Sequence, residues 1–222
     1  MSQFSTRDRR TLREILHPMP RPVDVWAFTG SDPAIDETAW LHELSELTEG
    51  RIDVTVFPAL DVMPLSTALG VVARPSFRVL GAGGEIAPLD IVGVPTGYQF
   101  GAFVQLLMAL ARNKSQLPHN RTSAVKNLQQ DTVMEILVTP TCPHSPQLVR
   151  LAEDYALANP ARLFVRIVDA VQCPDLVPTG VEAVPHLRLF QDGVLVAERA
   201  GMTPASDLWR MIHGGRKGES KR

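Results

Sequence analysis

The fold is decided by one stretch of sequence, Thr139-Pro140-Thr141-Cys142-Pro143-His144-Ser145, which joins an apolar strand pattern to an amphipathic helix pattern. The strand pattern covers residues 134–139 and the helix pattern residues 143–158. A cysteine between a buried strand and a helix start is placed for chemistry, because unpaired N–H groups there stabilise a thiolate. The position three residues after Cys142 is Ser145, so the motif supplies one thiol and not two.

The surroundings of this stretch occur twice in the chain at a constant spacing. Pro75 and Pro185 each open an apolar strand that runs into a glycine turn, and they lie 185 − 75 = 110 positions apart. Residues 41–47 and 151–157 are helical segments with the same offset, and so are the strand segments 52–57 and 162–167. An offset shared by three segments indicates an internal repeat.

Each copy predicts the order β-α-β followed by β-β-α. The first two strands of a copy should be parallel and joined by a right-handed crossover helix, and the strands around the glycine turn should form an antiparallel hairpin. This order is typical of the thioredoxin fold, here present twice, and the two sheets can join edge to edge, which protects their edge strands. The expected elements are strands at 23–29 and 134–139, helices at about 34–48 and 143–158, strands at 52–57 and 162–167, 72–80 and 182–190, and 86–92 and 194–199, and closing helices at 100–112 and 204–213.

We therefore predict an α/β protein with two tandem thioredoxin-like folds, whose central mixed sheets are flanked by helices. Amphipathic helices should precede the copies, at residues 7–16 behind a cap at Ser5 or Thr6, and at residues 122–130. The predicted organisation is a cysteine-free unit at 1–113, a linker at 114–121, a unit with the Cys-Pro-His-Ser site at 122–214, and a disordered basic tail at 215–222.

Composition excludes several classes of protein. The chain has 222 residues, 45 % hydrophobic and 21 % charged, with a formal net charge of −2, so we expect no nucleic-acid partner. Residues 1–16 lack the apolar core of a signal peptide, and no run reaches the roughly 18 apolar residues of a membrane helix. We expect no membrane association and a cytoplasmic location. Two cysteines and six scattered histidines form neither a disulfide framework nor a zinc-ligand pattern, so no metal site is expected.

The motif around Cys142, with Leu148-Val149-Arg150-Leu151-Ala152 after it, resembles the second active site of the prokaryotic glutaredoxin-like protein disulfide oxidoreductases, which are tandem thioredoxin-fold proteins. Residues 43–48 and 93–100 are similar to first-unit segments of that family. Residues 93–100 also resemble the amino-terminal domain of the alkyl hydroperoxide reductase flavoprotein. The similarity runs from about residue 7 to residue 213.

Two departures from that family limit what the resemblance implies. Family members carry Cys-x-x-Cys in one or both units, whereas here no cysteine precedes Cys142 and the first-unit site falls near residues 31–35. The second unit keeps the first cysteine of its motif and has Ser145 in place of the second. A two-thiol oxidoreductase activity therefore does not carry over.

The expected site is built around the helix start. Cys142 should lie at or just before the first turn, with Pro143 at the first helical position. His144 is a candidate to stabilise the thiolate by a hydrogen bond or positive charge, or else an ordinary exposed side chain. Ser145 can donate a hydrogen bond to the sulfur but cannot resolve a mixed disulfide.

A second part of the site is expected from the other end of the unit. Val184-Pro185 is a candidate cis peptide. The resemblance implies that this proline packs beside the sulfur and that the backbone before it pairs with a substrate. Pro75 is the equivalent residue of the first unit. Cys173 lies after a strand beside Pro174 and fits an incidental position better than that of a resolving thiol.

Three functions fit these observations. The leading one is a thiol-disulfide protein of monothiol type, in which Cys142 forms mixed disulfides with protein disulfide or thiol clients, and glutathione is a candidate co-substrate. This chemistry would serve exchange, isomerisation or deglutathionylation, without a bound cofactor. The alternative is a catalytically degenerate thioredoxin-fold module that binds partners as a scaffold. A third is iron–sulfur binding by the Cys-x-x-Ser site, as in some monothiol glutaredoxins. The sequence predicts no oligomeric state.

Overall fold

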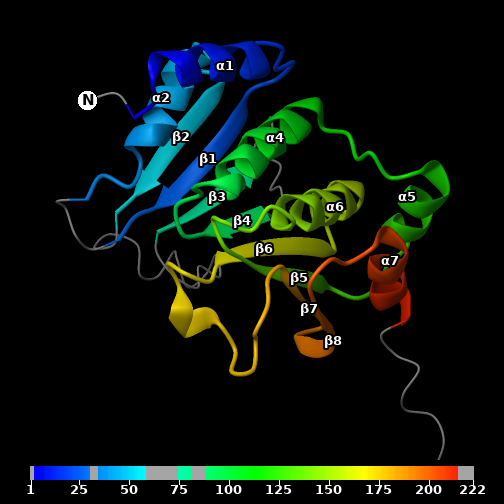
Figure 1. The fold of residues 1–222 in the computed structure, drawn as a ribbon. Coiled ribbons are helices and arrows are strands. Elements are labelled where there is room, and N and C mark those ends of the chain that lie inside the picture. Colours follow the sequence, from blue (N-terminus) through cyan, green and yellow to red (C-terminus); the bar gives the residue numbers. More distant parts are fainter. Residues whose placement is uncertain (1–2, 31–34, 59–74, 82–88, 215–222) are drawn as a thin grey trace, which may run out of the picture.

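One eight-stranded mixed sheet runs through the molecule, with the described α-helices over one of its faces (Figure 1). The structure is a computed structural model and describes residues 3–30, 35–58, 75–81 and 89–214. The predicted tail at 215–222 lies outside the described residues, as do residues 31–34 of the predicted first-unit site. Residues 82–85 of the glycine turn and residues 86–88 of the strand expected after it also lie outside them.

The elements follow the predicted order. They are α1 (Thr6–Leu16), β1 (Val23–Phe28), α2 (Ala39–Leu47), β2 (Ile52–Phe57), β3 (Ser76–Leu80), β4 (Leu89–Val92), α4 (Tyr98–Arg112), α5 (His119–Lys126), β5 (Thr132–Val138), α6 (Ser145–Ala158), β6 (Leu163–Asp169), the 3₁₀ helix η1 (Pro174–Leu176), β7 (His186–Gln191), β8 (Val194–Ala200) and α7 (Ala205–Gly214).

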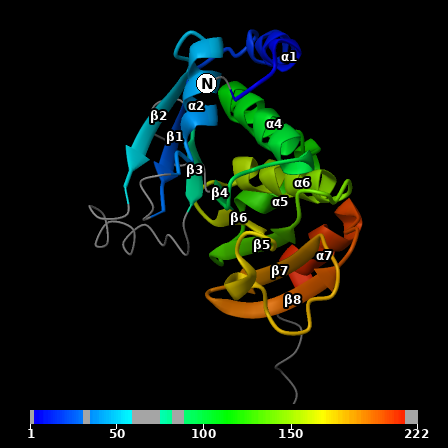
Figure 2. The ribbon, with the colours of Figure 1, turned by 60° about the vertical axis from the view of Figure 1, so that its left-hand side comes forward.

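The strand order is β2-β1-β3-β4-β6-β5-β7-β8, so the two halves of the chain contribute four neighbouring strands each. The pairs β1–β2 and β5–β6 are parallel, and the pairs β3–β4 and β7–β8 are antiparallel, which confirms the predicted pairing. The two four-stranded sheets join edge to edge through the parallel pair β4–β6. Figure 2 shows the accumulated twist, with β1 and β2 upright and β7 and β8 nearly horizontal.

Local sequence explains where α1 begins and why α5 was misplaced by the prediction. At the start of α1, Ser5 Oγ accepts a hydrogen bond from the Asp8 N–H at 3.1 Å, which is the predicted cap. Helix α5 covers His119–Lys126, not residues 122–130, because Pro118 ends the extended segment before it and can precede a helix directly. Only Val125 of α5 is buried, so its apolar periodicity is too weak to place the helix from sequence.

The main core is continuous across both halves of the chain, on the helix-covered face of the sheet. Trp40 of α2 is its aromatic centre in the first half. The indole meets three phenylalanine rings edge-on, with centroid distances of 5.4 Å to Phe77, 6.1 Å to Phe100 and 5.1 Å to Phe103. These contacts fix α2 and α4 against the strands of the first sheet.

A row of alternating charges crosses the opposite face of the sheet at a single register. Arg78 pairs with Asp90 across β3–β4, and Asp90 is the register partner of Arg166 across the β4–β6 joint. Nitrogen–oxygen distances are 2.6 Å for Arg78–Asp90, 3.5 Å for Arg166–Glu135 and 2.7 Å for Arg188–Glu135. Because the partners alternate in sign, Asp90, Arg166 and Glu135 each have opposite charges on both neighbouring strands.

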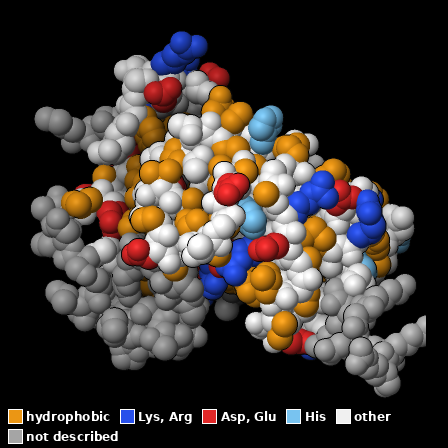
Figure 3. Space-filling view, turned by 60° about the horizontal axis from the view of Figure 1, so that its bottom comes forward, with side chains coloured by type: hydrophobic (Ala, Val, Ile, Leu, Met, Phe, Trp, Pro, Cys, Tyr) orange, Lys and Arg blue, Asp and Glu red, His pale blue; other side chains and the backbone are white. Residues whose placement is uncertain are grey.

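The molecular surface seen with the lower side of Figure 1 brought forward carries hydrophobic side chains over its middle (Figure 3). Acidic and basic side chains stand among them, and the described lysines and arginines in this view do not merge into one continuous patch. The face is thus mixed in character.

Candidate functional site

Cys142 lies in the loop between β5 and α6, and the fold brings it against the segment before β7. Its N–H donates to the Thr139 carbonyl at 3.2 Å. Its thiol donates to the Val184 carbonyl, with 3.6 Å between Sγ and O. The next peptide bond, Val184–Pro185, is cis. Cys142 is a buried residue, with 8 % of its surface exposed.

Helix α6 begins later than the sequence suggested. Its first residue is Ser145 and its N-cap is His144, so Pro143 precedes the helix instead of occupying its first position. The proline at the helix start is Pro146, which has no N–H with which to close a turn onto the Cys142 carbonyl. Cys142 is therefore three residues outside the helix, in the loop that leads to its positive end.

The two polar neighbours in the motif differ in exposure. Ser145 is fully buried, and its hydroxyl makes no hydrogen bond with the part of the chain that the structure describes. His144 is exposed, and its side chain makes no capping hydrogen bond. The roles expected for both side chains at the sulfur stay predictions.

The second cysteine lies in a different environment. Cys173 is buried and free, like Cys142. Burial, together with the nearby carboxylates of Asp169 and Asp175, raises the pKa of the Cys173 thiol. It belongs to a small apolar cluster under η1, with Val92, Leu137 and Val168. A protonated thiol in an apolar cluster is a poor nucleophile, so this environment supports an incidental position.

The structure adds a residue that sequence reasoning missed. His186 directly follows Pro185 and is buried, yet neither ring nitrogen has a hydrogen-bond partner among the described residues. Its Nε2 lies 3.6 Å from the nearest Glu198 carboxylate oxygen. The alternation His186-Leu187-Arg188-Leu189 could have placed this side chain on the face opposite the main core, but it does not predict its burial.

The first half of the chain also reaches the site. Residues 93–99 leave β4 and enter α4, and on the way they contact the loop before Cys142. The Tyr98 N–H donates to the Pro140 carbonyl at 2.9 Å, and Gln99 Nε2 donates to the Thr139 carbonyl at 3.2 Å. The sequence marked residues 93–100 as a familiar segment but did not predict this contact.

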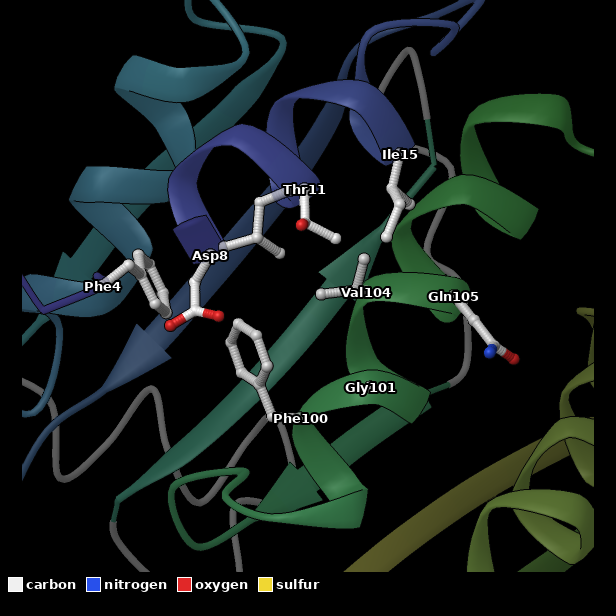
Figure 4. A pocket seen from close by; sticks show the side chains of 9 residues that line it. Phe4, Asp8, Thr11, Ile15, Phe100, Gly101, Val104 and Gln105 are labelled. Atoms are coloured by element: carbon white, nitrogen blue, oxygen red, sulfur yellow. The ribbon is translucent and has the colours of Figure 1, made fainter. Parts of the chain in front are cut away.

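A hollow lies between α1 and α4, away from Cys142. It has a volume of about 610 Å³, and Phe4, Ile15, Phe100 and Val104 give it an apolar lining (Figure 4). Asp8 lines it as well, and the rings of Phe4 and Phe100 contact each other with centroids 5.4 Å apart. None of its lining residues belongs to the loops around Cys142 or Pro185.

The described residues hold neither a metal-binding cluster nor a membrane-spanning helix. No group of three or more histidine, cysteine, aspartate or glutamate side chains among them is arranged to hold a metal ion. Within the same residues, no helix has the length and apolar character needed to cross a membrane.

Two β-α-β-β-β-α units sharing one sheet, with a cysteine before the first helix of the second unit, define a tandem thioredoxin-like protein. Among solved structures, the chain is similar to a protein disulfide oxidoreductase from Aeropyrum pernix, with a TM-score of 0.82 and 24 % identity, over 100 % of this chain and 97 % of that one. It is also similar to the F component of alkyl hydroperoxide reductase from Enterococcus faecalis, with a TM-score of 0.81 and 20 % identity, over 95 % of this chain and 100 % of that one. These likenesses confirm the predicted fold.

Curated proteins that are similar in sequence are relatives of the same kind. The F component of alkyl hydroperoxide reductase from Pseudomonas aeruginosa is 23 % identical over 178 residues, covering 80 % of this chain and 32 % of that protein. The Staphylococcus epidermidis protein of the same name is 24 % identical over 185 residues, covering 83 % and 33 %. The chain thus spans about a third of the length of the curated relatives it matches. No protein-family model matches it. These comparisons confirm the resemblance, inferred from the motifs, to protein disulfide oxidoreductases and to the amino-terminal domain of the alkyl hydroperoxide reductase flavoprotein.

Proposed function

We propose that this protein carries out thiol-disulfide exchange through Cys142 as its single nucleophile. The observation that carries the proposal is the contact between the Cys142 thiol and the Val184 carbonyl, at 3.6 Å between residues 42 positions apart. It joins the helix-start cysteine and the segment before Pro185 into one site. The similarity to the Aeropyrum pernix protein disulfide oxidoreductase supports the same class of chemistry.

The proposed reaction has two exchange steps. The Cys142 thiolate attacks one sulfur of a disulfide R–S–S–R′, so that the bond Cys142–S–S–R forms and R′ leaves as a thiolate. An external thiolate R″–S⁻, from glutathione or a protein cysteine, then attacks the R sulfur and releases Cys142 as a thiolate. The sum exchanges R′ for R″ on the disulfide without net oxidation or reduction. This balance suits isomerisation or deglutathionylation.

The first experiment asks whether Cys142 forms the mixed disulfide. The purified, reduced protein is incubated with glutathione disulfide, and the peptides carrying Cys142 and Cys173 are quantified by mass spectrometry. We expect a glutathione adduct on Cys142, its loss in Cys142→Ser, and its retention in Cys173→Ser. Unchanged adduct formation in Cys142→Ser would remove the basis of the proposal.

The second experiment tests the dependence on an external thiol. In wild type, a mixed disulfide between Cys142 and a peptide should persist, at one peptide per protein molecule, until free thiol is added. The reason is that no neighbouring cysteine can attack it. Ser145→Cys places a thiol at the second position of the motif, and this variant should release the peptide without added thiol. Equal release by both proteins would contradict a single-thiol mechanism.

The alternative function, a scaffold that binds partners without turnover, predicts a different outcome. Partners captured by a scaffold would survive treatment with dithiothreitol and would be captured equally by Cys142→Ser. Partners held by exchange chemistry would be released by the reductant and lost in the variant. The cytoplasmic setting expected from the sequence stays a prediction, and it would supply the external thiol.

A further inference from the structure

The segment 93–99, called the crossing segment from here on, links the cysteine-free half of the chain to the loop of Cys142. It begins at the end of β4 and ends in the first turn of α4. Near its start, the Val94 N–H donates to Gln172 Oε1 at 3.0 Å, and Gln172 Nε2 donates to the Val94 carbonyl at 2.8 Å. The crossing segment is thus fastened to the loop after β6 before it reaches the loop after β5.

Its far end contacts the two residues that lead to Cys142. Gln99 Nε2 donates to the Thr139 carbonyl at 3.2 Å, and the Cys142 N–H donates to the same oxygen at 3.2 Å. Gln99 is 6 % exposed, so this hydrogen bond is shielded from water. One carbonyl therefore couples a side chain of the first half to the backbone of the candidate nucleophile.

Gly97 brings the two chain segments to contact distance. Its φ of +56° lies in the left-handed region, which residues with a Cβ rarely adopt. A Cβ built on Gly97 would lie 2.3 Å from the Pro140 carbonyl oxygen, well inside van der Waals contact. That same oxygen accepts the Tyr98 N–H at 2.9 Å. Glycine is needed here for the close approach as well as for the backbone angle.

We infer that Gln99 and Gly97 are positioning residues for Cys142, so that the cysteine-free half of the chain holds the reactive loop of the other half. The inference rests on the proposed function for its catalytic meaning, since neither residue contacts the sulfur. With the crossing segment in place, the Cys142 thiol is kept against the Val184 carbonyl beside Pro185. Without it, the loop at 139–142 would lose the two hydrogen bonds that Gln99 and Tyr98 donate to it.

Loss of this support should move two rates in opposite directions. A released loop exposes the thiol, so iodoacetamide, which needs no docking, should alkylate Cys142 faster. A peptide disulfide must meet the sulfur beside Val184–Pro185, so its exchange with a less well placed thiol should slow. We expect Gln99→Leu to lower the ratio of exchange rate to alkylation rate about fivefold, the size of effect given by one shielded hydrogen bond.

The chain supplies matched controls on the same helix. Gln105 of α4 is exposed, so Gln105→Leu makes the same chemical change without touching the loop. A Cβ added at Gly101 of α4 would have no atom within 4 Å, so Gly101→Ala is the control for Gly97→Ala. Both rates are read on the Cys142 peptide by mass spectrometry across a range of pH, and circular dichroism checks that each variant is folded.

The outcomes separate this inference from the proposed function. A ratio in Gln99→Leu equal to that in Gln105→Leu would overturn the positioning role. If wild type shows no exchange with a peptide disulfide, the proposed function fails, but alkylation of Cys142 still tests positioning. A faster alkylation in Gln99→Leu alone would then support it, and equal alkylation would overturn it. Should Gly97→Ala fail to fold, the pair Gln99→Leu and Gln105→Leu still decides.

Discussion

Replacing Glu153 by glutamine should make the stability of this protein less dependent on pH. Glu153 lies on α6 and is 1 % exposed, and it shares a small internal cavity with Gln99 and Val149. Burial raises the pKa of its carboxyl from 4.5 to about 8, with Asp154 adding to the rise and Arg150 opposing it. Glu153 Oε1 has no hydrogen-bond partner in the described part of the chain, so the protonated form is the one that suits this position.

The size of the effect follows from the difference between the folded and unfolded states. Between pH 4.5 and about 8, the folded protein holds a proton on Glu153 that the unfolded chain has released. The free energy of unfolding contributed by this group is therefore highest below pH 4.5 and falls as the pH rises to about 8. At about 1.4 kcal/mol per pH unit, the fall is about 3 kcal/mol between about pH 5 and pH 7, and about 5 kcal/mol at most over the whole window.

Urea unfolding at several pH values measures this directly. Glu153→Gln should match wild type at about pH 5 and be more stable than wild type by about 3 kcal/mol at about pH 7, because glutamine has no proton to lose. Glu14→Gln is the control, since Glu14 is an exposed carboxyl on α1. Parallel stability curves for wild type and Glu153→Gln across this range would refute the reasoning.

Three other changes test the packing and the site. Trp40→Ala removes the aromatic centre of the first half and should lower the free energy of unfolding by about 3–5 kcal/mol, measured in urea. Glu135→Ala leaves Arg166 and Arg188 facing each other without their shared carboxylate, and because both are about one fifth exposed the loss should be about 1–3 kcal/mol and larger at low salt. Ser145→Ala removes a buried hydroxyl that has no partner among the described residues, so thermal melting should show equal or greater stability, by about 0.5–1 kcal/mol; a clear loss would mean that the hydroxyl is satisfied.

The strand pattern was predictable because its causes are local. In β5 and β6 the alternate residues Met134, Ile136, Val165 and Ile167 face the main core, and this alternation is visible in the sequence. The glycine turns and the 110-residue offset then place the hairpins. The edge-to-edge joining of two sheets was foreseen from the fold class, whereas the register of β4 on β6 depends on contacts between segments far apart in the chain.

The residues of the candidate site were predictable from the sequence, but the structural contacts around them were not. Cys142, Val184 and Pro185 were identified from spacing and motif, and the fold brings them together. The helix start was misplaced because Pro143 and Pro146 both suit a first turn, and the sequence does not show which of them occupies it. In the structure it is Pro146. The burial of His186 was not predictable, because the alternation in β7 indicates only which face of the sheet the side chain is on.

The contacts of Gln99 and Gly97 with the loop at 139–140 link the cysteine-free half of the chain to the candidate site. Gly97 cannot accept a Cβ without moving the Pro140 carbonyl, and the Cys142 N–H shares its acceptor with Gln99. The β4–β6 pairing adds a second constraint, because removing either sheet would leave the other with an open edge. We therefore expect the cysteine-free unit to contribute to the geometry around Cys142.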